Sequence, residues 1–348
     1  MNEQRLAVLI VNYQRAADTL ECLSSLLCIT EPKFEIFLVD NGSKADDVTR
    51  LQNYVSCYPH RIIFTAFPSN LGFTGAHNKL FEELIPSGRY NYFLLLNNDT
   101  VVEPDFLARM LARIDSTHRL EMVAARMMKY ENRTCVDNLG ITFYKCGLAS
   151  NRKSLDEPLL GPCGGCALYS TDLLRQIYQA TGEYFDEKFF CYAEDTDLAW
   201  RAIWLGYRAA WADDALVYHK GSVSSGGPNS DFVLYHGIRN SLFVLVKNIP
   251  ICLLLKNSGW IVILHSAIIL RYIIKHKTKV IFFLYKDFLL FFPVMWNKRS
   301  KIIHKKKFIL SYINLQVSKN FYDRTYLKSA LHELLGSFTP DFIKAKKR

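Results

Sequence analysis

The chain of 348 residues lacks the regular cysteine spacing of a disulfide-stabilised secreted protein. It has nine cysteines, and their spacing indicates no disulfide framework. Cys163 and Cys166 form a lone Cys-x-x-Cys pair, and no second pair or histidine cluster completes a zinc site. We therefore interpret this stretch as a glycine-rich loop. The first apolar run, Leu6–Val11, is too short for a signal peptide, so a reducing cytoplasm is the expected compartment.

The sequence also lacks two glycine patterns that mark nucleotide-binding loops. Neither the dinucleotide fingerprint Gly-x-Gly-x-x-Gly nor the phosphate loop Gly-x-x-x-x-Gly-Lys-Ser/Thr occurs. Their absence argues against an NAD-dependent enzyme and against a P-loop nucleoside triphosphatase.

Acidic residues are scarce in the last third of the chain. Residues 241–348 contain 20 Lys and Arg against 4 Asp and Glu, whereas residues 1–240 contain 23 against 29. An acidic part joined to a basic, apolar part suggests two tasks. We expect a catalytic domain over residues 1–245 and a helical C-terminal region over residues 246–348.

A clean apolar run of about 20 residues, as a membrane-spanning helix needs, is absent as well. Residues 251–274 and 280–296 are mostly apolar, but charged residues interrupt both. The basic run Lys298–Lys307 follows. Apolar, aromatic helices beside clustered cations favour the surface of an anionic membrane, and a helical subdomain packed on the core is the alternative. Because the basic run matches no recognised nucleic-acid-binding module, nucleic acid is not an expected partner.

What is present in the first hundred residues is an alternation of apolar segments and segments with helical periodicity. Strands are expected at residues 6–11, 34–39, 61–65 and 90–96. Helices are expected at 16–28 and 45–55, and a third follows residues 70–78 and ends at about residue 84. This order predicts an α/β fold with a parallel, doubly wound sheet.

Polar residues follow three of these strands directly. They are Asn12-Tyr13, Asp40-Asn41 and Asn97-Asn98-Asp99. The carboxyl ends of parallel strands lie at one edge of a sheet, where open α/β folds bind ligands. We therefore expect these side chains, Asp99 among them, to converge on one site.

The later part of the sequence is less regular. It predicts helices at residues 104–115 and 172–180 and strands at 121–128 and 209–218, but residues 129–158 give no firm assignment. Glu194, Asp195 and Asp197 crowd the start of a further helix. Acidic residues in a first turn are ordinary capping, yet three carboxylates among so many aromatic residues exceed what a cap needs.

Seven motifs in this order resemble the family 2 glycosyltransferases of the GT-A fold, of the rhamnosyltransferase-like kind. The resemblance spans roughly residues 6–240. Its motifs are Val11-Asn-Tyr13, Val39–Ser43, Asn70–Asn78, Leu96–Thr100, Gly164–Leu168, Phe185–Arg201 and His219–Ser222. The implied fold is a GT-A nucleotide-diphospho-sugar transferase, a Rossmann-like and mostly parallel sheet, with a C-terminal helical, basic and apolar extension.

The resemblance implies roles for individual residues. Asp40 would contact the base or ribose of a nucleotide sugar, with Val11 and Tyr13 lining the base pocket. Asn70, Gly72 and Asn98 would also belong to the site that binds the donor. Asp99 is the last position of the Asp-x-Asp-type motif and would hold a divalent cation, Mn²⁺ or Mg²⁺, on the diphosphate. Asn97 stands where the first carboxylate is usual, and His219 matches a position that completes metal coordination in some members.

Asp195 matches the general base of the family, and Glu194, Asp197, Trp200 and Arg201 would lie on the acceptor side. A base without an enzyme nucleophile implies single displacement and inversion at the anomeric carbon. A cation would stabilise the leaving diphosphate.

The expected function is therefore an inverting, metal-dependent sugar transfer in cell-surface polysaccharide synthesis. The donor would be a UDP- or dTDP-sugar, dTDP-rhamnose among them, and the acceptor a glycan or lipid-linked glycan. The expected location is the cytoplasmic face of the cell membrane. A nucleotidyltransferase acting on a sugar phosphate and a non-catalytic glycan-assembly partner are the alternatives.

Overall fold

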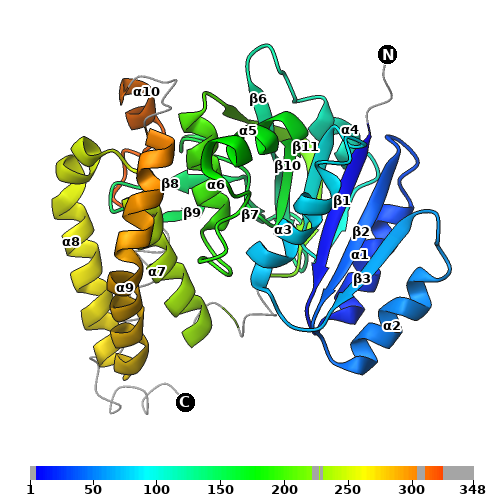
Figure 1. Cartoon of the computed structure of the whole chain (residues 1–348), viewed down its shortest axis with the longest axis horizontal. Helices are drawn as coiled ribbons and strands as arrows, with labels where there is room; N and C mark the ends of the chain where they lie inside the picture. The colour runs from blue at the N-terminus through cyan, green and yellow to red at the C-terminus, as the bar shows by residue number, and fades with distance from the viewer. Residues whose placement is uncertain (1–4, 222–226, 228–229, 304–309, 324–348) are drawn as a thin grey trace, which may run out of the picture.

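The computed structural model describes residues 5–221, 227, 230–303 and 310–323 (Figure 1). Its first part is a regular alternation of strands and helices. The elements are β1 (Leu6–Asn12), α1 (Ala16–Leu27), β2 (Phe34–Asn41), α2 (Ala45–Val55), β3 (Ile62–Phe67), α3 (Gly72–Leu84) and β4 (Tyr92–Leu96). β1 pairs in parallel with both β2 and β4, and β2 pairs in parallel with β3. The parallel arrangement predicted from the sequence is confirmed for these four strands.

The second part completes one large sheet and adds a small hairpin. Its elements are β5 (Thr100–Val102), α4 (Phe106–Leu111), β6 (Leu120–Lys129), β7 (Val136–Asn138), β8 (Ile141–Phe143), β9 (Ala149–Asn151), β10 (Cys166–Ser170), α5 (Thr171–Thr181), α6 (Glu194–Trp204) and β11 (Arg208–His219). The sheet has the order β3-β2-β1-β4-β10-β6-β11-β5, and β7 pairs with β6. β10 runs antiparallel to β4 and β6, so the sheet is mixed.

Two differences from the sequence-based expectation have local causes. The helix expected over residues 104–115 is confined to α4, because Asp115 pairs with Leu120 in a β-bridge. The unassigned stretch 129–158 contains β7, β8 and β9, each of three residues. Such short strands carry too few alternations to show a period of two.

The core forms two layers, one on each face of the sheet. In β1, Leu6, Val8 and Ile10 pack on the face that α1 and α4 cover, whereas Ala7 and Leu9 face α3, α5 and α6. This alternation follows from the period of two in a strand. Both faces of the central strands are therefore buried, as expected for a parallel sheet.

The C-terminal helices are α7 (Asp231–Asn248), α8 (Ile251–Ile274), α9 (Thr278–Ile303) and α10 (Leu310–Leu315). Figure 1 shows α7, α8 and α9 side by side at one end of the molecule, with α7 nearest the sheet. α7 crosses the boundary expected at residue 245. The larger core cluster contains Phe243 of α7 and also Leu284 and Met295 of α9. A division at residue 245 therefore does not separate two cores.

Part of the basic run Lys298–Lys307 is turned inward. Lys298 pairs with Glu183 and Asp186, and Arg299 donates a hydrogen bond to the carbonyl of Val246 at 2.8 Å. The expectation that this run faces lipid is wrong for these two cations. Residues 304–307 of the run lie outside the described residues.

Candidate active site

The carboxyl ends of β1, β2 and β4 meet in a buried hydrogen-bonded network, as the sequence predicts. Asn12 Nδ2 donates to Asp40 Oδ2 at 2.7 Å, and the hydroxyl of Thr19 donates to Asn12 Oδ1 at 2.7 Å. Asn98 Nδ2 donates to the Thr19 hydroxyl at 2.9 Å. The network links the ends of β1, β2 and β4 and fixes the loop that carries Asp99.

A largely apolar pocket of about 420 Å³ opens beside this network. Among the residues that line it are five of the six predicted donor-binding residues: Val11, Tyr13, Asn70, Gly72 and Asn98. Aromatic rings complete the lining and come from Phe73, Phe190 and Phe232. A pocket of this size and lining suits a flat heterocycle such as a nucleobase.

Asp40 does not line this pocket. Its side chain is fully buried and accepts hydrogen bonds from Asn12 Nδ2 and from the backbone N–H of Ser43. Its neighbour Asn41 lines the pocket instead and holds the adjacent loop, donating to Asn70 Oδ1 and to the carbonyl of Gly72. The expectation that Asp40 contacts base or ribose therefore needs correction, because the carboxylate is used to close the β2 turn.

Gly72 opens α3 where the chain leaves no room for a side chain. Its φ is +72°, and an added Cβ would lie 2.4 Å from the carbonyl oxygen of Phe190. The backbone N–H of Thr74 donates to that same carbonyl at 3.2 Å. Glycine thus brings the start of α3 against the loop before α6, and the two segments wall the pocket together.

A second cavity of about 300 Å³ adjoins the first, with Phe73, Asn97, Asn98 and Cys191 lining both. Its walls carry most of the predicted chemical groups: Asp99, Glu194, Asp195 and His219. The backbone of Gly164 and Gly165, from the predicted glycine-rich loop, completes it. The structure therefore brings the predicted metal-binding and catalytic residues into one cavity.

His219 lies between two carboxylates in this cavity. Its Nε2 is 3.3 Å from Asp99 Oδ1, and its Nδ1 is 2.8 Å from Asp137 Oδ2. Burial alone would lower the pKa of His219, but its hydrogen bonds to Asp137 and Asp99 and their negative charges raise it to about 10. The imidazole is accordingly protonated at neutral pH while both carboxylates face it.

The donor atoms at this point fit a divalent cation that also binds a diphosphate. Among the described residues, no three or more His, Cys, Asp or Glu are arranged to hold a metal by themselves. Neighbouring ligands of an octahedral ion with bonds of about 2.1–2.2 Å lie about 3 Å apart, close to the separation of Asp99 Oδ1 and His219 Nε2. Such ions usually take one or two protein carboxylates and fill their remaining positions with phosphate oxygens and water.

Asp137 is a residue of this site that the sequence did not indicate. It lies on β7, in the stretch left unassigned, and reaches His219 because β7 pairs with the end of β6. A carboxylate on the far nitrogen of a metal-binding histidine fixes its ring orientation. A carboxylate partner for His219 could therefore be expected in general terms, but nothing in the sequence distinguishes Asp137 from the other acidic residues.

Asp195 and Glu194 begin α6 and differ in their hydrogen bonding. Asp195 Oδ2 accepts from the backbone N–H of Gly164 at 2.9 Å, and Oδ1 accepts from that of Thr196 at 2.6 Å. Glu194 Oε2 is buried and has no hydrogen-bond partner in the described part of the chain. Asp195 is therefore oriented from both sides, whereas Glu194 keeps a free oxygen.

Burial raises the pKa of both carboxyl groups. For Asp195 the backbone hydrogen bonds from Gly164 and Thr196 offset part of the rise in pKa. For Glu194 the pKa lies well above its usual value, because burial is reinforced by the charge of Asp195. Of the two, Asp195 is the one whose negative charge backbone N–H groups stabilise, which suits the anionic state that a general base requires.

Asp197, Trp200 and Arg201 do not line the cavity. They are fully buried behind it, and Arg201 Nε donates to Asp197 Oδ2 at 2.8 Å. The expectation that they contact the acceptor needs correction, because helical periodicity turns them towards the core while Glu194 and Asp195 face the cavity. Their role is to anchor α6.

The chain is similar to known glycosyltransferases in sequence and in fold. The family model described as glycosyl transferase family 2 matches residues 7–178, just under half of the chain. An N-acetylglucosaminyltransferase from Rhizobium leguminosarum bv. viciae is 26% identical over 205 residues, which cover 57% of this chain and 46% of that protein. The chain thus spans less than half the length of this relative.

Two solved structures share the fold over most of the chain. One is S. aureus TarS 1–349 in complex with UDP-GlcNAc, with a TM-score of 0.55 and 15% identity, covering 94% of this chain and 92% of that one. The other is the mannosyltransferase PcManGT from Pyrobaculum calidifontis in complex with GDP-Man and Mn²⁺, with a TM-score of 0.54 and 12% identity, covering 88% and 86%.

The fold is that of the GT-A glycosyltransferases, extended by C-terminal helices. The match over residues 7–178 supports family 2 within that fold. In this chain the aromatic pocket adjoins the cavity that contains the Asp99–His219 pair and the carboxylates of Glu194 and Asp195.

Proposed function

We propose that this glycosyltransferase moves a sugar from a nucleoside diphosphate donor to an acceptor hydroxyl with inversion at the anomeric carbon. One observation carries the proposal. Asp99 and His219 line the same cavity as Asp195, and that cavity adjoins the aromatic pocket. The base, the diphosphate and the sugar of one donor can therefore lie along a single path.

In this proposal the aromatic pocket holds the base, and Asn97 and Asn98 border the path towards the diphosphate. Asp99 and His219 would hold the divalent cation, with Asp137 fixing the imidazole. Bound there, the cation supplies charge stabilisation to the leaving diphosphate. Metal binding at Nε2 must release the proton of His219, so the site binds the cation more tightly as the pH rises.

Asp195 would accept the proton of the attacking hydroxyl. Backbone N–H groups hold both of its oxygens, so the carboxylate is oriented before the acceptor arrives. Glu194 lines the same cavity, and its Oε2 has no hydrogen-bond partner among the described residues, so we assign Glu194 to the acceptor or to the transferred sugar. With Asp195 assigned as the base and no residue assigned as a nucleophile, the proposed reaction is a single displacement rather than one through a covalent intermediate.

For the donor, the similarity to an N-acetylglucosaminyltransferase and to a UDP-GlcNAc-bound structure favours UDP-GlcNAc. A dTDP-sugar such as dTDP-rhamnose is the second candidate. We propose a glycan or a lipid-linked glycan of the cell surface as acceptor, in keeping with a place at the cytoplasmic face of the membrane.

A panel of nucleotide sugars with Mn²⁺ tests the proposal. We expect release of a free nucleoside diphosphate, fastest from UDP-GlcNAc, and a product of inverted anomeric configuration by NMR. Release of pyrophosphate from a nucleoside triphosphate and a sugar phosphate would instead indicate a nucleotidyltransferase. Failure to bind or turn over any donor would indicate a non-catalytic partner.

A further inference from the structure

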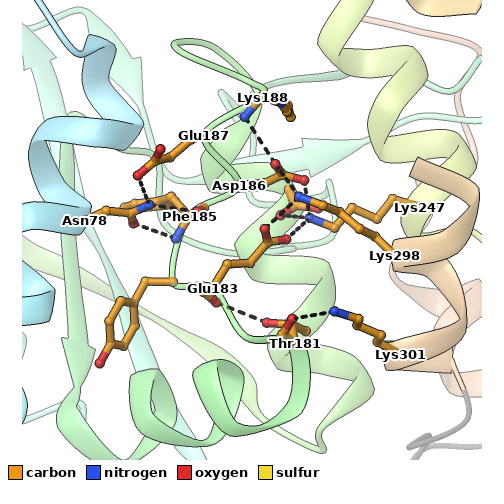
Figure 2. A network of polar contacts seen from close by, with 12 residues as sticks. Asn78, Thr181, Glu183, Phe185, Asp186, Glu187, Lys188, Lys247, Lys298 and Lys301 are labelled. Carbon is orange, nitrogen blue, oxygen red and sulfur yellow. Dashed lines mark hydrogen bonds and ion pairs between the residues drawn. The ribbon is translucent and has the colours of Figure 1, made fainter. Parts of the chain in front are cut away.

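Three carboxylates and three cations gather behind the catalytic cavity, and Figure 2 shows lysines from two helices reaching into this cluster. Lys247 of α7 lies 2.9 Å from Asp186, 2.9 Å from Glu183 and 3.1 Å from Asp197. Lys298 of α9 lies 2.7 Å from both Glu183 and Asp186. With Arg201, which pairs with Asp197, the cluster is balanced in charge.

Burial makes the partners in this cluster interdependent. Lys247, Asp186 and Asp197 are each at most 1% exposed. Removing one member of a buried ion pair leaves an uncompensated charge and is strongly destabilising. Lys298 is the exception, since it is 23% exposed and approaches the cluster from outside. The cluster therefore ties the segment 183–186 and α6 to α7 and α9.

A second set of contacts holds the chain between Asp186 and α6. The side-chain amide of Asn240, on α7, donates to the carbonyls of Phe189, Cys191 and Tyr192 at 2.8–2.9 Å. Phe190, Tyr192 and Ala193 have φ values of +63°, +72° and +64°. Non-glycine residues persist in such conformations only where the surroundings impose them, at a cost of about 1–3 kcal/mol each.

We propose that α7 and α9 form a brace that positions the catalytic segment 183–197, with Lys298 and Asn240 as positioning residues for Asp195 and Glu194. The brace acts on the strained loop and on both of its ends. Asn240 donates hydrogen bonds to carbonyls of the loop. Lys247 pairs with Asp186 before the loop and Asp197 after it, and Lys298 pairs with Asp186. These residues lie beyond residue 178, where the family match ends. The inference rests on the proposed function for the role of Asp195, but not for the existence of the brace.

The brace makes the C-terminal helices part of the catalytic unit rather than an appended anchor. A displacement of about 1 Å at a reacting group can lower turnover about 100-fold. Phe190 and Cys191 of the braced segment line the donor pocket, but α3 and the ends of β1 and β4 build the rest of it. Loss of a brace contact should therefore reduce turnover more than donor affinity.

Lys298→Met in the full chain is the principal test, because this lysine is partly exposed and its loss leaves Lys247 in place. We expect kcat to fall roughly ten- to 100-fold, with a clearly smaller rise in the dissociation constant for UDP. Hydrogen–deuterium exchange should become faster in residues 183–197 and stay unchanged in β1–β4. Lys298→Arg should restore most of the turnover.

Lys301→Met is the matched control. Lys301 lies on the same helix, is exposed, and among the described residues contacts the carbonyl of Thr181 at 3.5 Å. It should retain wild-type turnover and exchange. Asn240→Ala is the second variant, which removes the grip on the loop without altering the charge cluster, and it should reproduce the selective loss of kcat.

The inference is overturned if Lys298→Met and Asn240→Ala keep kcat within twofold of wild type. It is also overturned if both variants lose structure throughout the chain, since the contacts then serve stability in general. Should the wild-type protein turn over no donor, the proposed function fails, while the exchange rates of residues 183–197 still decide whether the brace holds them.

Discussion

At the residue scale, Asp195 combines an oriented carboxylate with a pKa that burial raises above its ordinary value. Asp195→Asn keeps the shape of the side chain and removes the proton acceptor. Because a general base contributes about 10²–10⁴-fold to rate, we expect turnover to fall by that order while UDP affinity stays near wild type. Stopped assays of nucleoside diphosphate release and calorimetry of UDP binding measure the two quantities. Loss of UDP binding in parallel with turnover would assign Asp195 to the donor site instead.

Glu194 is predicted to lower the stability of the folded protein at neutral pH. Its pKa in the folded state lies well above the ordinary 4.5, through burial and the charge of Asp195. The folded state therefore holds this proton more tightly than the unfolded state does. Stability from this group is present at low pH and is lost as the pH rises from about 4.5 towards the folded-state pKa.

Glu194→Gln removes that penalty, so its melting temperature should exceed that of wild type at pH 7, and the difference should vanish near pH 4. Thermal unfolding across this range measures the effect, with the exposed Glu83→Gln as control. A difference that is independent of pH would show that ionisation of Glu194 is not its cause.

Asp137 is predicted to act on the metal through His219. Asp137→Asn replaces the carboxylate that orients the imidazole by a neutral amide. Loss of such a partner typically lowers metal affinity about 10–100-fold. Mn²⁺ titration by electron paramagnetic resonance, in the presence of UDP, measures this directly. Asp99→Ala should remove detectable binding at the same site. An unchanged titration in Asp137→Asn would return the His219–Asp137 contact to a structural role.

At the element scale, the N-terminus of α3 depends on Gly72. Gly72→Ala combines a strained φ with a clash against the carbonyl of Phe190, so we expect a loss of stability of about 1–3 kcal/mol and weaker UDP binding. Gly88→Ala is the matched control, because Gly88 has φ +68° but no atom within 4 Å of an added Cβ. If both variants behave alike in denaturant unfolding and UDP binding, the clash with Phe190 is not what matters.

The elements that the sequence predicted are those whose signal is local. β1, β2 and β4 and their helices follow from periodicity within each segment, and the polar strand ends placed Asp99 correctly at the sheet edge. β5, β7 and the antiparallel placement of β10 depend on pairing with distant strands, which no local pattern encodes. Asp137 was missed for the same reason, because it lies on β7. The side of α6 that carries Asp197, Trp200 and Arg201 was assigned to the acceptor because the sequence does not show which side of this helix packs against the core.

At the scale of the whole molecule, α8 and α9 present an apolar surface that the described part of the protein does not cover. Leu255, Leu289 and Leu290 are 71%, 67% and 67% exposed. Both helices are long and apolar enough to cross a membrane by length and composition, and only 17% of each apolar window is buried. Since Lys298 and Arg299 are used inside the protein, attraction to lipid should depend on apolar area more than on these cations.

We therefore predict that the full chain sediments with lipid vesicles and that 1 M NaCl releases only a minor part, because salt screens charge but not apolar insertion. Leu289→Gln with Leu290→Gln should reduce binding to anionic and neutral vesicles alike. Leu155→Gln makes the same type of substitution at a leucine that is 57% exposed and lies outside these helices, and it should leave vesicle binding unchanged. Resistance of the bound protein to alkaline carbonate would indicate spanning helices rather than helices lying in the interface. If the full chain ignores both kinds of vesicle, this surface serves contact with another protein, and the proposed membrane location is wrong.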